Sequence, residues 1–261
     1  MKILFLGDIV GKPARQFLKK ALYQLKEKTE AELVVANGEN AAGGSSITPD
    51  TAKDIFDAGV DIITSGDHIF KKKEARVVLE KDPLIRPLNY GKSAVGSGYI
   101  IKEVKGTKVA VLNLLGRVFM NPVDCPFKAA EKILPKIKEE TNIVIVDMHA
   151  EATSEKLAMG YFLAGKVSAV LGTHTHVPTA DQRIIDDFTA YVTDVGMTGS
   201  FDSVLGREKS QIIKRFITNM PVRFHLAKGD LRIQGILLDI DSDQGKAISI
   251  EKIEFCEKDL N

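Results

Sequence analysis

Short apolar runs rich in β-branched residues recur along this chain, and a helical pattern follows each of the first three. These runs cover residues 3–6, 33–36 and 60–64. None of them alternates apolar with polar side chains, which is typical of strands that are covered on both faces. The chain is therefore predicted to adopt an α/β fold in which helices flank a buried sheet.

The rest of the sequence extends this pattern to its end. Further strands are expected at residues 97–103, 107–114, 142–146, 168–171, 183–185, 189–193, 231–241 and 248–255. Helices are expected at about residues 13–28, 70–80, 127–139, 154–164 and 210–219, with another opening at Thr48-Pro49-Asp50. Pro135 is expected to kink or shorten its helix. The strands after Asp181 are expected to form a second, mostly antiparallel sheet. Because the sequence contains no linker, we expect one domain over residues 1–261.

Composition limits the partners and the compartment. The 36 Lys and Arg residues nearly balance the 35 Asp and Glu residues, and a net charge of +1 argues against a dominant nucleic-acid-binding face. Cys125 and Cys256 are the two cysteines, so no disulfide framework is expected and a reducing cytoplasm is the default. The first residues lack a signal-peptide pattern, and no apolar segment approaches bilayer-spanning length. We expect a soluble, cytoplasmic protein with no membrane partner and no stable nucleic-acid partner.

Side chains of metal-ligand type follow five of the predicted strands. In an open α/β sheet, functional groups gather beyond the carboxyl ends of the strands, so these side chains are expected to meet at one edge. Imidazole, carboxylate and amide groups together are the donors of a transition-metal site. The candidate ligands are Asp8, Glu39, Asn40, Asp67, His149, His174 and His176.

Seven candidates exceed the three or four protein ligands that one metal ion needs. The surplus favours two ions that share a bridging carboxylate at a separation of about 3.5–4 Å, as in phosphoester hydrolysis. Oxygen and imidazole donors without thiolate favour Fe, Mn, Co or Zn over Ca. His68 adjoins the candidate ligand Asp67 and is therefore expected near the metals without having to bind one.

Several short motifs resemble those of known phosphoesterases. The motifs Gly7-Asp8, Asn37-Gly38-Glu39-Asn40, Gly66-Asp67-His68 and Gly172-Thr173-His174-Thr175-His176 are similar to the calcineurin-type metallophosphoesterase pattern. Finer matches at residues 37–44, 116–120, 149–156 and 194–199 resemble the YmdB-like branch of bacterial phosphodiesterases, over nearly the whole chain. The resemblance implies a four-layer αββα sandwich of two mixed sheets flanked by helices. It also implies a dinuclear metal site and hydrolysis of small phosphodiesters such as 2′,3′-cyclic nucleotides.

The resemblance also implies roles for individual residues. Glu39 would bridge the two metals, and His68 would be the catalytic histidine beside the phosphate. A metal-bridging hydroxide would attack phosphorus while His68 acts as general acid for the leaving alkoxide. Iron is the expected metal, with manganese as the alternative. The remaining ligands divide into Asp8, Asn40 and His176 on the first metal and Asp67, His149 and His174 on the second.

Two residues and two other functions stay open at this point. The family usually has Asn where this chain has Asp67, and Asp lacks the N–H donor and adds a negative charge, which affects rate and substrate affinity. Arg117 lies beyond a strand end and could hold a phosphate oxygen or form a structural ion pair. The alternatives to a phosphodiesterase are a phosphomonoesterase for nucleotides or phosphoproteins and a metal-retaining regulatory or RNA-associated protein with weak catalysis. A homo-oligomer is compatible with each of these three functions.

Overall fold

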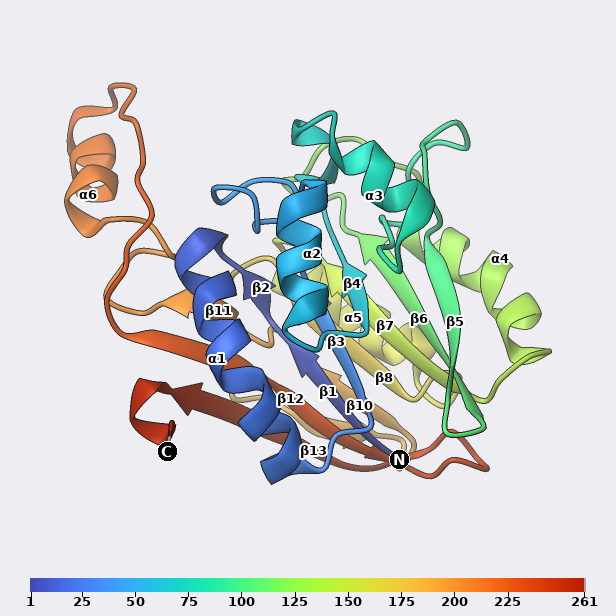
Figure 1. Cartoon of the computed structure of the whole chain (residues 1–261). Coiled ribbons are helices and arrows are strands. Elements are labelled where there is room, and N and C mark those ends of the chain that lie inside the picture. The colour runs from blue at the N-terminus through green and yellow to red at the C-terminus, as the bar shows by residue number, and fades with distance from the viewer. Residues whose placement is uncertain (261) are drawn as a thin grey trace.

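The computed structural model of the chain describes residues 1–260, in which two β-sheets pack face to face between two layers of helices (Figure 1). The first sheet contains β1 (Lys2–Leu6), β2 (Asp8–Ile9), β3 (Leu33–Asn37), β4 (Ile62–Thr64), β11 (Met197–Ser200), β12 (Leu231–Ile240) and β13 (Ala247–Cys256). The second contains β5 (Tyr99–Val104), β6 (Thr107–Leu115), β7 (Ile143–His149), β8 (Ala169–Thr173), β9 (Arg183–Ile185) and β10 (Thr189–Val192).

Helices cover the outer face of each sheet. The α-helices are α1 (Gly11–Thr29), α2 (Pro49–Asp57), α3 (Ala75–Lys81), α4 (Pro126–Lys138), α5 (Thr153–Leu163) and α6 (Lys209–Thr218), and the 3₁₀ turns are η1 (Ile69–Lys71) and η2 (Glu257–Asp259). The start of α2 is as predicted, because the Thr48 side chain accepts from the backbone N–H of Thr51 and Pro49 occupies the first helical position.

Alternation along each strand assigns its side chains to separate core layers. In β1, Leu4 packs under α1 and α2, whereas Ile3 faces the second sheet. In β6, Val111 faces the first sheet, whereas Leu112 packs with the residues of α4 and α5. Three buried layers of apolar side chains therefore separate four layers of secondary structure, which confirms the predicted αββα sandwich of two mixed sheets.

Parallel pairing brings the carboxyl ends of the central strands to one edge of the sandwich. In the first sheet, β1, β3 and β4 are parallel neighbours. In the second sheet, β6, β7, β8 and β10 run parallel in that order. The loops that leave these strands consequently lie near one another, and they carry the candidate ligands.

The strands after residue 181 do not form a sheet of their own, so that part of the sequence prediction is wrong. β9 and β10 extend the second sheet, because β10 pairs in parallel with β8. β11, β12 and β13 belong to the first sheet, where β12 runs antiparallel to β1. Burial explains this placement: Ile236 and Leu238 of β12 complete the apolar layer between the two sheets.

Two predicted helices also differ from the structure. The helix expected at residues 70–80 is interrupted between η1 and α3, because the Ser46 hydroxyl donates to the carbonyl of Ile69 and accepts from the N–H of Lys72. These bonds replace those that a continuous helix would make. Pro135 does not shorten α4, which continues to Lys138; Pro135 lies on the exposed side, where water can satisfy the carbonyl that loses its donor.

One glycine in the second sheet provides a test of this packing. A Cβ at Gly172 would lie 1.8 Å from the backbone oxygen of Thr193, which cannot move aside as a flexible side chain could. We expect Gly172→Ala to lower the free energy of unfolding by about 1–3 kcal/mol, measured by urea titration of the metal-free protein. Gly91→Ala is the control, since a Cβ there meets open space. Equal stability of the two variants would contradict the packing described here.

Candidate metal centre and active site

The seven predicted ligands come together at the carboxyl edge of the two sheets. The end of β1 leads into Asp8, the loop after β3 carries Glu39 and Asn40, and the loop after β4 carries Asp67. The last residue of β7 and the loop after β8 supply the three histidines His149, His174 and His176. Both sheets therefore contribute donors to one place.

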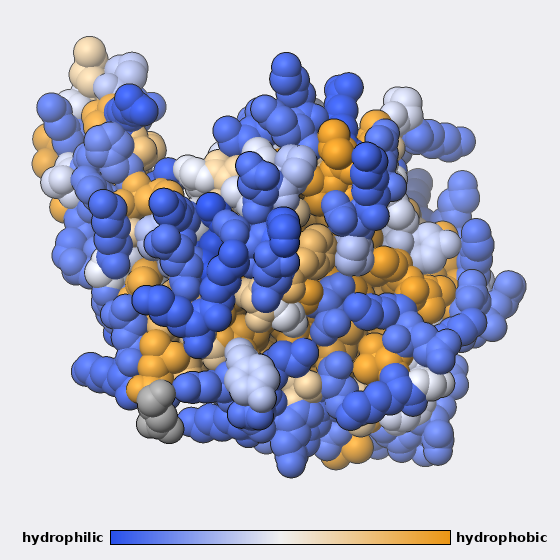
Figure 2. Space-filling view, viewed as in Figure 1, coloured by the Kyte–Doolittle hydropathy of each residue, from blue (hydrophilic) through white to orange (hydrophobic). Residues whose placement is uncertain are grey.

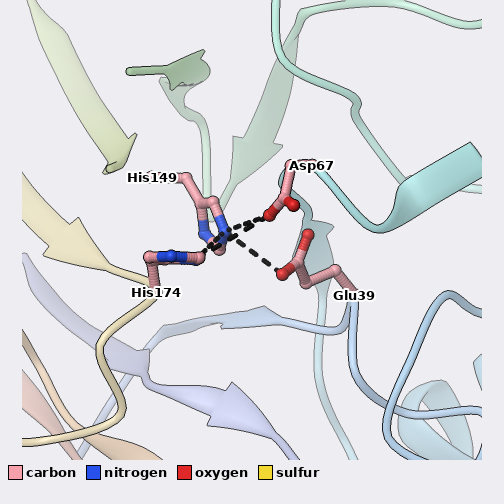
Figure 3. A group of neighbouring side chains, drawn as sticks. All are labelled: Glu39, Asp67, His149 and His174. Carbon is pink, nitrogen blue, oxygen red and sulfur yellow. Dashed lines mark hydrogen bonds and ion pairs between the residues drawn. The ribbon is translucent and has the colours of Figure 1, made fainter. Parts of the chain in front are cut away.

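Four of these side chains form a compact donor group, drawn in Figure 3. One ligand atom from each of Glu39, Asp67, His149 and His174 lies within 4.8 Å of the others. The His149 Nε2 atom is central, at 3.1 Å from Glu39 Oε1, 3.4 Å from Asp67 Oδ1 and 3.1 Å from His174 Nδ1. Carboxylate oxygens and imidazole nitrogens thus converge on one point from three loops and the end of β7.

A second donor group adjoins the first. The Asn40 Nδ2 atom lies 3.3 Å from Asp8 Oδ1 and 3.3 Å from His176 Nε2. The same nitrogen lies 3.4 Å from Glu39 Oε1, the oxygen that also contacts His149. Glu39 is therefore common to both groups, as a bridging carboxylate would be.

Two local features show that the first group fits a cation. Asp67 Oδ1 is buried and has no hydrogen-bond partner within residues 1–260, although it points at the nitrogens of His149 and His174. A Cβ at Gly66 would lie 2.2 Å from His149 Nε2 and 2.5 Å from Glu39 Oε2, so glycine keeps this space open. An unpaired buried oxygen facing two imidazoles in such a space is suited to a metal ion. The cluster therefore supports binding of divalent metal.

A series of buried hydrogen bonds behind His149 fixes the orientation of its imidazole ring. His149 Nδ1 lies 2.8 Å from the Thr173 hydroxyl, which donates to Asp147 Oδ1 at 2.6 Å. The Asn37 amide donates to the other carboxylate oxygen at 3.1 Å. Burial raises the pKa of Asp147 to about 6. Asp147 faces away from the donor groups and orients an imidazole instead, as outer partners of metal-binding histidines commonly do.

The turn that carries the other two histidines is held by a buried ion pair. His174 and His176 have φ angles of 97° and 63°, which non-glycine residues seldom adopt. Thr175, between them, donates to Asp194 Oδ2 from its N–H at 3.1 Å and from its hydroxyl at 2.8 Å. Lys156 Nζ, 2.8 Å away, neutralises this buried carboxylate. The strained turn persists because Asp194 anchors its centre.

His174 has a further partner on its outer side. Its Nε2 atom lies 3.0 Å from Glu151 Oε2, which leaves Nδ1 facing the donor group. Burial, together with the positive charge of His149, lowers the pKa of His174. Glu151 was not a candidate in the sequence because it is one of many acidic residues, and its position beside His174 depends on the pairing of β7 with β8.

Opposite charges in the cluster shift the pKa values of its members. Burial by itself would raise the pKa of Asp8, but the charge and hydrogen bond of His176 outweigh burial and lower it well below the usual range. Burial would also raise the pKa of Asp67, but the polar contact and charge of His149 lower that pKa to about 2. Burial would lower the pKa of His149, yet the Glu39 carboxylate raises it well above its usual value. Asp8 raises the pKa of His176 against burial in the same way.

His68 lies beside both donor groups with its side chain half-buried. Its backbone N–H donates to Glu39 Oε2 at 2.9 Å, and its Nδ1 atom lies 3.1 Å from Asn40 Oδ1. Its Nε2 atom lies 3.6 Å from Asp67 Oδ2. His68 also lines an open cleft of about 570 Å³ over the cluster. It is therefore adjacent to the donors and accessible to a molecule in the cleft.

Arg117 is not brought to this cluster. The residue is exposed, and its backbone N–H donates to Glu155. Within residues 1–260 its side chain neither forms an ion pair nor lines the cleft that contains His68. Its role in holding phosphate stays a prediction.

The far wall of the cleft was missed by sequence reasoning. It is formed by residues between β11 and β12, among them Leu205, Phe216 and Phe224. The helix in this segment was predicted, and its apolar residues were visible in the sequence. Their position opposite His68 depends on how the segment folds back, which has no local signal.

A family model for YmdB-like proteins matches residues 4–253 of this chain. The chain belongs to the YmdB-like protein family. This membership confirms the resemblance drawn from the strand-end motifs.

Similarity to relatives extends over the whole length of this YmdB-like chain. It is 45% identical over 254 residues to a 2′,3′-cyclic-nucleotide 2′-phosphodiesterase of Bacillus subtilis (strain 168), covering 97% of this chain and 96% of the relative. The crystal structure of a protein from Thermus thermophilus matches with a TM-score of 0.93 and 38% identity, over 98% of this chain and 100% of that one. The crystal structure of a phosphatase from Mycoplasma pneumoniae matches with a TM-score of 0.92 and 37% identity, over 98% and 93%.

A more distant structure supports the same fold for the YmdB-like chain. A calcineurin-like phosphoesterase from Bacillus subtilis matches 98% of this chain and 90% of its own, with a TM-score of 0.55 and 13% identity. Residues 1–260 include no helix that is both long and apolar enough to cross a membrane.

The raised histidine pKa values of the YmdB-like cluster lead to a prediction about metal uptake. A raised pKa favours the protonated form of His149 and His176 in the metal-free protein, and a metal ligand must give up its proton. We expect Mn²⁺ binding at pH 7 to release protons and its affinity to rise with pH through this range. Calorimetry in two buffers of different ionisation enthalpy measures the release. His225→Gln, outside the cluster, is the control; binding without proton release would contradict the charge assignment.

Proposed function

We propose that this chain is a metal-dependent phosphodiesterase that hydrolyses 2′,3′-cyclic nucleotides. The activity named for the Bacillus subtilis relative, at 45% identity over nearly the full length, supports this substrate class. The donor cluster and the phosphoesterase fold support metal-assisted hydrolysis.

The position of Glu39 is the observation that carries this proposal. Its Oε1 atom lies within 3.4 Å of both His149 Nε2 and Asn40 Nδ2, which belong to different donor groups. A carboxylate shared by two sets of ligands is how two-metal phosphoesterases hold their ions together. His68 then stands at the junction of the two groups, with its backbone bonded to the other oxygen of Glu39.

In this proposal the donors divide as the family resemblance implies. Asp8, Asn40 and His176 would hold one ion, Asp67, His149 and His174 the other, and Glu39 both. When bound, the ions would supply Lewis-acid stabilisation of the phosphate charge and lower the pKa of the attacking water. A half-turn of the Asn40 amide, whose Nδ2 atom lies beside Asp8 and His176, would present its oxygen to the first ion.

His68 is proposed as the general acid. Its backbone N–H donates to Glu39 Oε2, and its imidazole lines the cleft. The oxygen of the attacking water bonds to phosphorus as the bond from phosphorus to one ribose oxygen breaks, and the released ribose oxygen takes a proton from the His68 imidazolium. The cyclic diester is thereby opened to a monoester, and the imidazole is left neutral.

Iron is proposed as the resident metal, with manganese as the alternative, in line with the family resemblance; the carboxylate and imidazole donors of the cluster, without thiolate, are compatible with both ions. The proposed compartment is a reducing cytoplasm, with which the free thiols of the two cysteines are compatible. A homo-oligomer is compatible with this function.

Two variants test the function and separate metal binding from acid catalysis. The metal-loaded protein is expected to hydrolyse adenosine 2′,3′-cyclic phosphate faster than the phosphomonoester p-nitrophenyl phosphate. His68→Ala should keep both metals and lower kcat by about 10²–10⁴. Glu39→Gln should lose metal and activity together while retaining its fold. Full metal occupancy without turnover of any diester would favour a binding protein, and preference for the monoester would favour a phosphatase.

Asp67, where the family usually has Asn, gives a second test. Its carboxylate adds a negative charge beside the site of the substrate phosphate, and Oδ1 faces two histidines. Asp67→Asn should weaken metal retention because this charge is lost, and should lower KM for the cyclic diester because the amide can donate. Metal analysis after dialysis, beside steady-state kinetics, measures both effects. Unchanged metal content and KM would mean that Asp67 contacts neither metal nor substrate.

A further inference from the structure

Residues 201–230, called the arm below, leave the first sheet after β11 and return to it as β12. The two legs of the arm are joined by backbone hydrogen bonds, at 2.8 Å from Phe201 N to Asp230 O and at 3.0 Å from Ala227 N to Gly206 O. Helix α6 lies at the far end, and Figure 1 shows it standing away from both sheets. The arm is thus an enlarged hairpin loop between two neighbouring strands.

The helix of the arm exposes apolar side chains that its own packing does not require. None of the residues of α6 is buried. Phe216 and Ile217 are 82% and 78% exposed, and Figure 2 shows apolar side chains gathered on this projection. Exposed apolar groups concentrated in one place commonly mark a binding surface. Helical spacing puts Ile212 on the face of Phe216, and Ile213 on the face of Ile217.

Of the two apolar faces of α6, only the one with Ile212 and Phe216 lines the cleft over the metal donors. One wall of the cleft consists of the polar residues Glu39, Asn40, His68, Glu151, His174, Thr175 and His176. The opposite wall consists of Val204, Leu205, Ile212, Phe216 and Phe224, with Arg207 and Arg215 beside them. A ligand filling this cleft therefore meets metal donors at one end and an apolar, aromatic surface at the other.

The arm is tied to the metal donors by one side chain. The Arg207 guanidinium donates to the carbonyls of Gly43 at 3.2 Å and Gly44 at 2.7 Å. These glycines belong to the same loop as Glu39 and Asn40. A Cβ at Gly44 would lie 2.1 Å from the guanidinium, so the close approach needs glycine. The apolar wall is therefore held at a defined place relative to the donors.

We propose that the arm forms the nucleobase subsite of this enzyme, with Phe216 and Phe224 contacting the base while the phosphate lies at the metal donors. This inference rests on the proposed function and names the group that recognises its substrate. A nucleotide joins a flat apolar ring system to a charged phosphate, which matches the two walls. The cleft volume of about 570 Å³ lies in the usual range of small-ligand sites. Aromatic side chains stack on any base.

The test compares substrates with and without a base. Full-length, metal-loaded protein is assayed on adenosine 2′,3′-cyclic phosphate and on the base-free 2′,3′-cyclic phosphate of methyl riboside. The nucleotide is expected to have the higher kcat/KM, by about 5- to 150-fold, the usual worth of stacking on an aromatic residue. Phe216→Ala should reduce this ratio several-fold, mainly through KM for the nucleotide, and leave the base-free substrate unaffected. Phe224→Ala should act in the same direction.

Ile217→Ala is the matched control, since Ile217 adjoins Phe216, is similarly exposed and does not line the cleft. Its ratio should equal that of the unaltered protein. Equal effects of Phe216→Ala on both substrates, or no effect on either, would overturn the proposal. A changed oligomeric state of Phe216→Ala with an unchanged KM would also overturn it, because a second copy would then cover the arm.

A binding measurement separates this inference from the proposed function. Calorimetric titration with adenosine monophosphate and with ribose phosphate needs no turnover. If neither cyclic substrate is hydrolysed, tighter binding of the nucleotide that is lost in Phe216→Ala still supports the subsite while the proposed reaction fails. Equal binding of the two probes overturns the subsite even if hydrolysis proceeds.

Discussion

Carboxylates that converge at the edge of two sheets can remain ionised only if positive charge lies among them. Asp8 and Glu39 are 0% and 1% exposed, and a buried charge without a partner is far less stable than a paired one. In the metal-free chain, protonated His149 and His176 supply the positive charge. Metal ions can replace those protons as the source of positive charge. The affinity of the cluster for cations therefore follows from its burial.

This charge balance depends on two sheets facing each other. The first sheet supplies the carboxylates and the second supplies the imidazoles, so neither sheet has a complete ligand set. The apolar layer between them, with residues such as Phe5 and Ile145, fixes their separation. The hydrogen bonds that link Asp147 to Thr173 and Thr173 to His149 set the orientation of the His149 ring. Asp194 holds the turn that carries the other two histidines.

The convergence of the candidate donors could be predicted because their signal is local. Each follows an apolar run that must be a strand, and parallel strands end at the same edge. The placement of β10 and β12 in different sheets could not be predicted, since it depends on which apolar face each strand completes. The break near Lys72 depends on Ser46, a residue remote in sequence. The cleft wall at Phe216 likewise depends on the path of a long connection, and its residues read as an ordinary amphipathic helix.

The arm has a consequence for how this fold can diversify. The first and last residues of the arm are hydrogen-bonded to each other where the arm leaves β11 and enters β12. The tip of the arm can therefore change in length or sequence without shifting any strand. The Arg207 guanidinium joins the arm to the donor loop through the carbonyls of Gly43 and Gly44. An enzyme built this way can acquire a new substrate preference at the tip of one loop while its reaction chemistry is inherited unchanged.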